Sequence, residues 1–386
     1  PELKRAMGPL AGIKLVEIAG LGPAPMCAML FADLGATVIR IERKAPIDLG
    51  LKRPRKYDLL LRSRPAIAVD LKTREGVELV LDLVQQADVL IEGFRPGVME
   101  RLGLGPDICL GRNARLVYGR VTGWGQEGPL AQAAGHDLNY VALTGAINAM
   151  GRRGEPPVIP LSMIGDFGGG ALYLAFGMLA ALIEARQSGK GQVVDAAMVD
   201  GVASMQTIFL GMHAAGLWRD ERGTNATDSG SHFYQVYECA DGKWICVAAL
   251  EDRFHAELLR RLGIEPGTIG AQMDPANWPK AQAILAARFR EKTRAEWCAL
   301  LEGTDACFAP VLSWREAPSH PHLSERQTFC EIDGVMQPAV APRFSRSLPD
   351  RPTLPQEITP EGTDRALTAW LDAEEIAALR AAGTLG

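Results

Sequence analysis

The sequence predicts an α/β fold in which helices cover both faces of a parallel, doubly wound sheet, followed by a smaller α+β domain. Short apolar runs alternate with helical segments up to residue 125, which is typical of a parallel sheet. From His232 onward the pattern changes to a hairpin followed by two helical stretches. The chain of 386 residues, 47% of them hydrophobic, is long enough for two domains and a large core.

The first strand–helix–strand unit spans residues 13–41. Residues 13–19 form a short apolar run that predicts a buried strand. A turn at residues 20–25 leads into a predicted helix over 26–34, and residues 37–41 predict the second strand. The turn resembles a dinucleotide-binding fingerprint, but Pro25 stands where the third glycine belongs, which argues against an NAD site.

Three further strands follow, at residues 66–70, 89–91 and 116–121, and an amphipathic helix is predicted over 75–86. Ligands of doubly wound sheets bind at the carboxyl ends of the strands. Just past such ends lie Arg43, Lys72 and Arg95.

The loop between the second and third strands is strongly basic. Two interpretations stay open: an ordinary solvated surface loop, or a pocket for a polyanion such as a nucleotide phosphate. Arginine suits the second task because its planar fork gives two hydrogen bonds to one phosphate. The cations in question are Lys52, Arg53, Arg55, Lys56, Arg62 and Arg64.

The middle of the chain contains its most apolar segment. Residues 167–183 are apolar throughout, which is at the short limit for crossing a bilayer, so we expect a buried core helix over 171–183 and no membrane span. A strand at 192–197 and a mostly helical stretch at 200–217 follow. The polar residues 219–230 predict a linker.

The second domain is predicted to begin with strands at 234–238 and 244–249 around an Ala-Asp-Gly turn, and then helices at 251–262 and 278–301. Residues 335–360, rich in proline, predict an extended arm. Thr359 is a plausible N-cap for a final helix over 359–382. We therefore expect a large domain over 1–220, a small domain over 221–330 and a C-terminal segment, 331–386, that returns to the large domain.

Charge and cysteine usage exclude several classes of protein. The 41 basic and 46 acidic residues give a net charge of −5, which indicates neither a nucleic-acid coat nor a polybasic membrane tail. The seven cysteines show no CxxC spacing, so neither a zinc site nor a disulfide framework is predicted. The first ten residues, PELKRAMGPL, lack an apolar signal core. Together these features predict a reducing, cytoplasmic location.

Two short motifs thirty residues apart carry the candidate chemistry. One is Gly-His-Asp-Leu-Asn-Tyr at 135–140, and the other is Gly-Asp-Phe-Gly-Gly-Gly at 165–170. Each places a proton acceptor beside glycine: His136 in the first and Asp166 in the second. Asp166 could be an N-cap for the apolar helix, because the first amides of a helix lack partners. Alternatively, His136 and Asp166 face each other across a carbon acid.

The second interpretation suits a proton next to a thioester carbonyl. Removing so weak an acid needs a base in contact and donors for the developing oxyanion. Inverting the carbon needs a second group on the opposite face. Asp137 could orient the imidazole of His136, and a helix start after Asp166 would supply free amides. The remaining histidines have no comparable setting, and His320-Pro-His322 is too short a motif to predict a metal site.

Over essentially its whole length the sequence resembles the α-methylacyl-CoA racemases, within the family III CoA-transferase superfamily. The resemblance is carried by a set of motifs in one order: GPLAGIKLVEIAGLGP, DLGATVIRIER, ADVLIEGFRPGVMERLGLGP, VTGWGQEGPLAQAAGHDLNY, IGDFGGG, GKGQVVDAAMVDG, YECADGKW and APRFSR. It implies a large Rossmann-like domain built from both chain ends, a small domain, and two subunits interlocked as a homodimer. The active site would then lie between the large domain of one subunit and the small domain of the other.

The resemblance also implies site residues. His136 would be the histidine base, Asp166 the aspartate and Glu251 the glutamate that supports the histidine, with Asp137 beside them. Glu251 has an ordinary interpretation as well, as an acidic residue at a helix start. The expected contacts to CoA and the thioester are Arg43, Val69, Asp70, Leu71, Lys72, Gly93, Phe94, Arg95, Arg101, Gly135, Leu138, Asn139 and Tyr140.

The implied function is interconversion of (R)- and (S)-2-methylacyl-CoA thioesters, with acyl-CoA as substrate and no cofactor or metal besides it. The alternative within the superfamily is a CoA-transferase whose aspartate, in the place of Asp166, attacks the thioester. Transferases generally lack the histidine, so His136 favours proton transfer. A catalytically idle CoA-binding scaffold is a third possibility, against which the presence of both His136 and Asp166 argues.

Overall fold

The computed structural model describes residues 8–45 and 52–385. The first seven residues, on which the expectation about a signal sequence falls, lie outside the described residues. The structure divides into two compact units. The large unit comprises the chain up to Leu143, Leu161–Met205 and everything from Gln327 onward, and the small unit comprises Thr144–Pro160 and Gln206–Arg326. The division thus falls near residues 205 and 326, where we expected 220 and 330, and 144–160 belong to the small unit.

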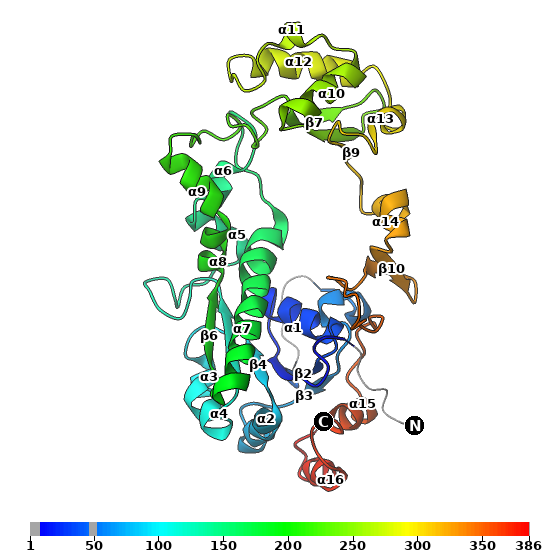
Figure 1. The fold of residues 1–386 in the computed structure, drawn as a ribbon. Coiled ribbons are helices and arrows are strands. Elements are labelled where there is room, and N and C mark those ends of the chain that lie inside the picture. The colour runs from blue at the N-terminus through cyan, green and yellow to red at the C-terminus, as the bar shows by residue number, and fades with distance from the viewer. Residues whose placement is uncertain (1–7, 46–51, 386) are drawn as a thin grey trace. The chain divides into compact units, whose positions relative to one another are not determined.

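The large unit contains a six-stranded parallel sheet of the doubly wound type, as predicted (Figure 1). The strand order is β3-β2-β1-β4-β5-β6, so the order reverses between β1 and β4. In such a sheet the crevice outside the reversal point is where ligands bind. The strands are β1 (Lys14–Ile18), β2 (Thr37–Glu42), β3 (Ala66–Ala68), β4 (Val89–Glu92), β5 (Val117–Thr122) and β6 (Gln192–Ala197).

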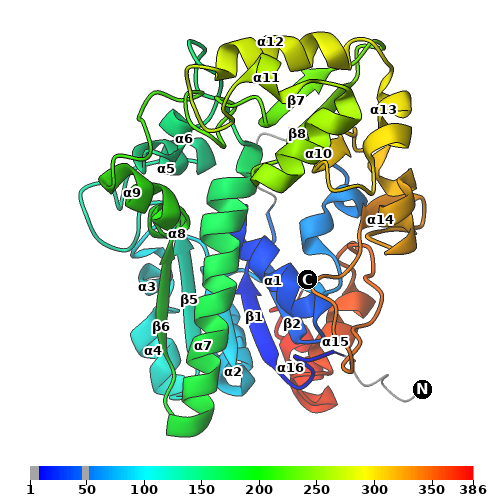
Figure 2. The same ribbon diagram turned by 45° about the horizontal axis from the view of Figure 1, so that its top comes forward.

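Side chains of successive residues in each strand enter two different cores. Val16 and Ile39 face one core, and Leu15 and Val38 face the other, as the two-residue period of a strand requires. Helices α1 (Pro23–Asp33) and α7 (Tyr173–Ser188) cover the second face (Figure 2). The first face is covered by α2 (Arg74–Gln86), α15 (Pro360–Leu367) and α16 (Ala373–Ala381). Both chain ends therefore build the large unit.

Several elements differ from the sequence prediction. Helix α1 begins at Pro23 rather than at residue 26, because proline is tolerated in the first turn. The region expected as an extended arm, 335–360, opens with the second strand of a hairpin, and the final helix is two helices, α15 and α16, with a capping box at Asp372 between them. The large unit also contains α3 (Val98–Arg101), α4 (Pro106–Arg112), α5 (Asp137–Leu143), η4 (Ile164–Leu172), α8 (Met198–Met205), β10 (Phe329–Ile332) and β11 (Val335–Pro338), with short 3-10 turns at η1 (Arg55–Tyr57), η2 (Leu59–Leu61) and η3 (Leu161–Met163).

The long apolar segment runs from Leu161 to Ser188 and is only partly buried. By length and composition this one segment of the described chain could cross a membrane, a test that core helices of soluble proteins also pass. Its inner face packs on β5 and β6, but Leu172, Phe176 and Ile183 are exposed. The expectation of a buried core helix therefore holds for one face of α7 only.

The small unit contains a three-stranded antiparallel sheet covered by helices, an α+β arrangement. Its strands, in spatial order, are β7 (Tyr234–Glu238), β8 (Trp244–Ala248) and β9 (Phe308–Pro310). The helix expected over 278–301 is interrupted by a capping box at Thr293. The helices are α6 (Ala146–Ala149), α9 (Thr207–Ala214), α10 (Asp252–Leu262), α11 (Pro266–Ile269), α12 (Trp278–Phe289), α13 (Arg294–Leu301) and α14 (Pro321–Glu325).

Three of the six cations in the basic loop, Arg55, Arg62 and Arg64, pair with carboxylates of the protein itself. Arg64 is buried and pairs with Glu17, at 2.6 Å from Nε to Oε2. Arg62 is also buried and pairs with Asp33, at 2.6 Å. Arg55 binds Glu42 at 2.9 Å. These arginines are neutralised by carboxylates of the protein itself, because the loop folds back onto the sheet.

Two histidines of the small unit form a buried pair. The Nε2 atoms of His232 and His255 lie 2.8 Å apart, and His232 is completely buried. Burial, with a smaller effect of His255, lowers the pKa of His232 to about 4 from an ordinary value near 6.5. Burial also lowers the pKa of His255, against the opposing charge of Asp252.

This pair predicts acid sensitivity. Above pH 6.5, His232 is mainly neutral in both the folded and the unfolded protein. Between pH 6.5 and 4, His232 binds a proton in the unfolded chain but not in the folded protein, so the free energy of unfolding falls as the pH falls. The loss should approach about 3 kcal/mol at pH 4. Urea unfolding from pH 7 to 4.5 should show a flatter dependence for His232→Leu than for wild type or for the control His213→Leu, at an exposed site. Equal slopes in all three proteins would contradict the assignment.

Candidate active site

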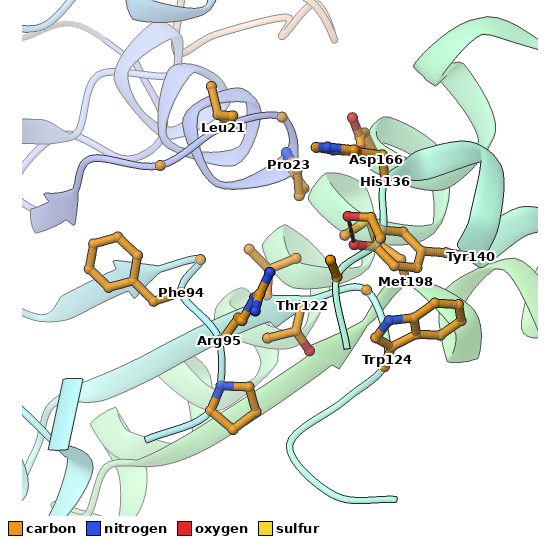
Figure 3. Close-up of a pocket in the computed structure, with 18 of the residues that line it drawn as sticks. Leu21, Pro23, Phe94, Arg95, Thr122, Trp124, His136, Tyr140, Asp166 and Met198 are labelled. Atoms are coloured by element: carbon orange, nitrogen blue, oxygen red, sulfur yellow. Dashed lines mark hydrogen bonds between the residues drawn. The ribbon is translucent and has the colours of Figure 1, made fainter. Parts of the chain in front are cut away.

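The candidate site is a pocket of about 530 Å³ in the large unit, at the carboxyl ends of the strands where the strand order reverses. Three turns line it: Gly20–Pro23 after β1, Gly93–Pro96 after β4, and Val121–Trp124 at the end of β5. His136 and Asp166 also line it (Figure 3). The two motifs singled out in the sequence therefore meet in one cavity.

His136 is held at the entrance to helix α5 by the residues that follow it. Its backbone N–H donates to Oδ1 of Asn139 at 3.0 Å, and its carbonyl accepts from the Asn139 amide at 2.8 Å. Tyr140 packs edge-on against Trp124, with 4.7 Å between ring centroids, and its hydroxyl donates to the Gly135 carbonyl. The backbone around His136 is thereby fixed from both sides, while its side chain stays exposed to the pocket.

Asp166 is not an N-cap, contrary to one interpretation of the sequence. It lies inside the π-helical segment η4 (Ile164–Leu172), which continues directly into α7. The helix starts before Asp166, and not after it as we had expected from the sequence. π-Helical turns are rare and often occur at functional sites.

The carboxyl group of Asp166 sits in a partly desolvated position. A Cβ atom on Gly22 would lie 2.9 Å from Oδ2 of Asp166, so the turn before α1 packs directly on the carboxylate. Burial, reinforced by the negative charge of Asp137, raises the pKa of Asp166 to about 6, against the effects of His136 and of a hydrogen bond with Ser162. A group with that pKa can both accept and donate a proton near neutral pH.

His136 and Asp166 interact electrostatically and lie next to each other in Figure 3. Asp137 does not take the role that the sequence suggested. Its Oδ1 accepts a hydrogen bond from the Asp166 amide at 2.6 Å, so its carboxylate faces the η4 backbone and not the imidazole of His136.

The glycines of the second motif pack against neighbouring helices, not against a ligand as the sequence suggested. A Cβ on Gly169 would lie 2.7 Å from Val202 of α8, and a Cβ on Gly170 would lie 2.9 Å from Pro23 of α1. In return, a Cβ on Gly201 would lie 2.0 Å from the Gly169 carbonyl oxygen. Only glycine allows η4 and α8 to approach this closely.

We predict that Gly201→Ala costs about 1–3 kcal/mol of stability, because the new methyl group pushes against backbone that carries Asp166. Gly111→Ala, in helix α4, meets no atom within 4 Å and should be neutral or stabilising by up to about 1 kcal/mol. Urea unfolding of the two variants gives the comparison. Similar unfolding midpoints would show that η4 and α8 can separate at little cost.

Some of the expected CoA contacts come together at the pocket. The guanidinium of Arg43 lies 5.7 Å from the centroid of the Phe94 ring, a cation–π arrangement at the mouth of the cavity. The expected residues that line the pocket are Arg43, Gly93, Phe94, Arg95, Gly135, His136, Tyr140 and Asp166.

The other expected residues lie elsewhere. Val69 is fully buried in the core, Leu71 packs against that core, and the Asp70 carboxylate accepts from the Lys72 amide in the turn after β3. Arg101, Leu138 and Asn139 are exposed but do not line the cavity. Glu251 is the N-cap residue of α10 in the small unit, with no side-chain capping bond.

Sequence reasoning missed three parts of the site. Thr122, Gly123 and Trp124 line the pocket and directly follow a predicted strand, so the rule that ligands bind at strand ends could have found them. Leu21 lines the pocket in the turn that was compared with a dinucleotide fingerprint. Ser162, which bonds Asp166, has no sequence signal beyond its position one helical turn earlier.

Comparison with known proteins places the chain in a family. The model of CoA-transferase family III matches residues 10–365. The chain therefore belongs to CoA-transferase family III. It is 43% identical to mouse α-methylacyl-CoA racemase, over 88% of this chain and 87% of that protein, and 40% identical to the human racemase, over 90% and 88%. The crystal structure of a CAIB/BAIF family protein from Brucella suis aligns with a TM-score of 0.80 and 27% identity, over 95% of this chain and 100% of that one.

Proposed function

We propose that the protein is an isomerase that interconverts (R)- and (S)-2-methylacyl-CoA thioesters. The observation that carries the proposal is the pairing of His136 with Asp166 in one pocket. The two racemase relatives, each more than 85% covered, support the same chemistry. Two proton carriers beside one cavity, one protonated when the other is not, can invert a carbon acid.

In the proposed reaction, one of the two groups takes the α-proton and its electron pair moves into the thioester to form an enolate. The other group, on the opposite face, returns a proton to the same carbon. Starting from one enantiomer His136 is the base, and starting from the other Asp166 is. The raised pKa of Asp166, about 6, lets it begin a turnover either charged or protonated at neutral pH.

The anchor for the CoA part of the substrate would be the cationic mouth of the pocket. Arg43, stacked on Phe94, and Arg95 are side chains suited to phosphate groups. Lys72 and Arg101 would add contacts farther from the reacting carbon, together with Val69, Asp70 and Leu71 through the turn after β3.

This chemistry requires no cofactor, since CoA is part of the substrate. All seven cysteines are free, which supports the proposed cytoplasmic location.

One experiment separates the racemase from a CoA-transferase. The protein is incubated with a single enantiomer of 2-methylacyl-CoA in deuterated water, with and without an added free carboxylic acid. The proposal expects deuterium at the α-carbon together with epimerisation. Transfer of CoA to the free acid without label would instead indicate an aspartyl nucleophile at Asp166. Asp166→Asn is the control, because both reactions need its carboxylate.

We also propose that the protein is a homodimer. The exposed side chains of Leu172, at the end of η4, and of Phe176 and Ile183 in α7 follow one another at helical spacing, and Phe176 is 75% exposed. An apolar stripe of this kind indicates an interaction surface. Light scattering should give twice the mass of the 41.6 kDa chain for wild type, and the chain mass for Phe176→Asp. Leu348→Asp, at another exposed apolar site, is the control and should stay dimeric.

The proposed role of Glu251 is to support His136 across that dimer, as the resemblance implies for interlocked subunits. Its side chain makes no capping bond to its own helix, which leaves the carboxylate available. Co-expression of His136→Ala with Glu251→Ala tests this. If each site takes the two residues from different subunits, random mixing restores about a quarter of wild-type activity. No restoration would mean that each site uses its own chain's Glu251.

A further inference from the structure

Asp137 follows one of the two groups that we propose carry the proton, His136, and it contacts the backbone of the other, Asp166. It is the first residue of α5, directly after His136, and is 7% exposed. Its Oδ1 accepts from the Asp166 amide at 2.6 Å, and the Gly165 amide donates to the same carboxylate. Asp137 therefore joins the His136 segment to the Asp166 segment through its side chain.

Gly165 shows that this contact is built into the fold. A Cβ atom at position 165 would lie 2.3 Å from Oδ1 of Asp137 and 2.8 Å from Val141. Any other residue would force the carboxylate away from the η4 backbone. The glycine before Asp166 is thus explained by the space that the Asp137 side chain needs, and not by a ligand.

The amides that bond Asp137 belong to the first turn of η4, where helical partners are lacking. A carboxylate at that position caps the turn from another segment of the chain. If Asp137 only capped this turn, an uncharged asparagine would serve equally well, because its side-chain oxygen accepts the same hydrogen bonds. A role in the reaction must therefore show in the charge of Asp137, not only in its hydrogen bonds.

The charge of Asp137 changes how readily Asp166 ionises. The negative charge of Asp137 opposes ionisation of Asp166, adding to the larger effect of burial that raises its pKa. Burial also raises the pKa of Asp137 itself, but the two donated amide hydrogen bonds work in the opposite direction. The hydrogen bonds favour a charged Asp137, and a charged Asp137 favours a protonated Asp166.

We propose that Asp137 is a positioning residue for the racemase reaction: it fixes the spacing between His136 and Asp166 and, through its charge, keeps a proton available on Asp166. The inference rests on the proposed function and deepens it. It also replaces the earlier idea that Asp137 orients the imidazole. The two parts of the role, spacing and charge, can be separated by two substitutions at this one position.

Asp137→Asn keeps an oxygen acceptor and removes the charge. We expect the pH at which Asp166 ionises to fall below about 6, toward that of an ordinary aspartate. The measurement is the ¹³C shift of aspartate side-chain carboxyls against pH, with the Asp166 signal identified by its loss in Asp166→Asn. Asp107→Asn, which removes an exposed first-turn aspartate of α4, is the control and should leave the titration unchanged.

Asp137→Ala removes both acceptor and charge. We expect kcat for both enantiomers to fall on the order of 10²-fold with little change in KM, since misplacement by about 1 Å has that effect on rate. Asp137→Asn should lose much less at its own pH optimum. Full activity of Asp137→Ala would overturn the spacing role, and an unchanged Asp166 titration in Asp137→Asn would overturn the charge role. Because the titration needs no substrate, it remains informative if wild type shows no deuterium exchange and the proposed function fails.

Discussion

His136→Ala protein is expected to lose α-proton exchange from one enantiomer of 2-methylacyl-CoA far more than from the other. Its remaining base, Asp166, can still abstract the proton that faces it. The loss on the opposite face should be 10²–10⁴-fold, the usual contribution of a positioned base. Asp166→Asn should show the reverse preference. Deuterium uptake by each enantiomer, measured separately by mass spectrometry, gives the four rates.

The pH dependence adds a second signature. Exchange by Asp166 requires its charged form, so in His136→Ala this rate should rise with pH and level off above the pKa of Asp166. That pKa should lie above the value of about 6 in wild type, because the lowering effect of His136 is lost. His213→Ala, an exposed histidine of the small unit, is the control and should match wild type on both faces. Equal losses for both enantiomers in both active-site variants would contradict the assignment of one base to each face.

Glu17→Ala should be the most damaging single change to stability outside the pocket. Glu17 is fully buried in β1 and is bound by Arg64 and by Arg40, both also buried. Removing it leaves two cations in the core with less compensation, which typically costs about 3–5 kcal/mol. The free energy of unfolding in urea checks this value, on the purified protein at neutral pH.

Glu78→Ala is the matched control for that experiment. Its ion pair with Arg112 lies on the surface of the same unit, with the Glu78 side chain 49% exposed. Surface pairs of this kind contribute about 0–1 kcal/mol. If Glu17→Ala were no more destabilising than Glu78→Ala, the buried cluster would have to be rearranging or hydrating when its carboxylate is removed.

The sheet was predictable because its strands are short apolar runs between turns. Strands β2 and β6 begin at the residues expected, and the sheet has the doubly wound order that was expected, with its reversal between β1 and β4. The helix breaks at Thr293 and Asp372 were missed, although both carry a glutamate three residues later and are readable capping boxes.

Other features could not be read from local sequence. Arg64 pairs with a residue 47 positions earlier, and Arg62 with one 29 positions earlier, so their charge alone does not reveal that they point inward. Asp166 precedes glycines and an apolar run, as an N-cap would, and only packing against α8 and α1 shows that the helix has already begun. The direction of Asp137 likewise depends on which segment lies beside it.

The two units are completed at different times during synthesis, because the sequence of the small unit is inserted within that of the large unit. The small unit is complete once Arg326 has emerged, whereas the large unit must wait for α15 and α16, which cover one face of its sheet. Until α15 and α16 have emerged, that apolar face stays bare, and nascent chains in this state are prone to associate with one another. We expect truncation before Pro360 to yield insoluble protein whose small unit is nevertheless folded.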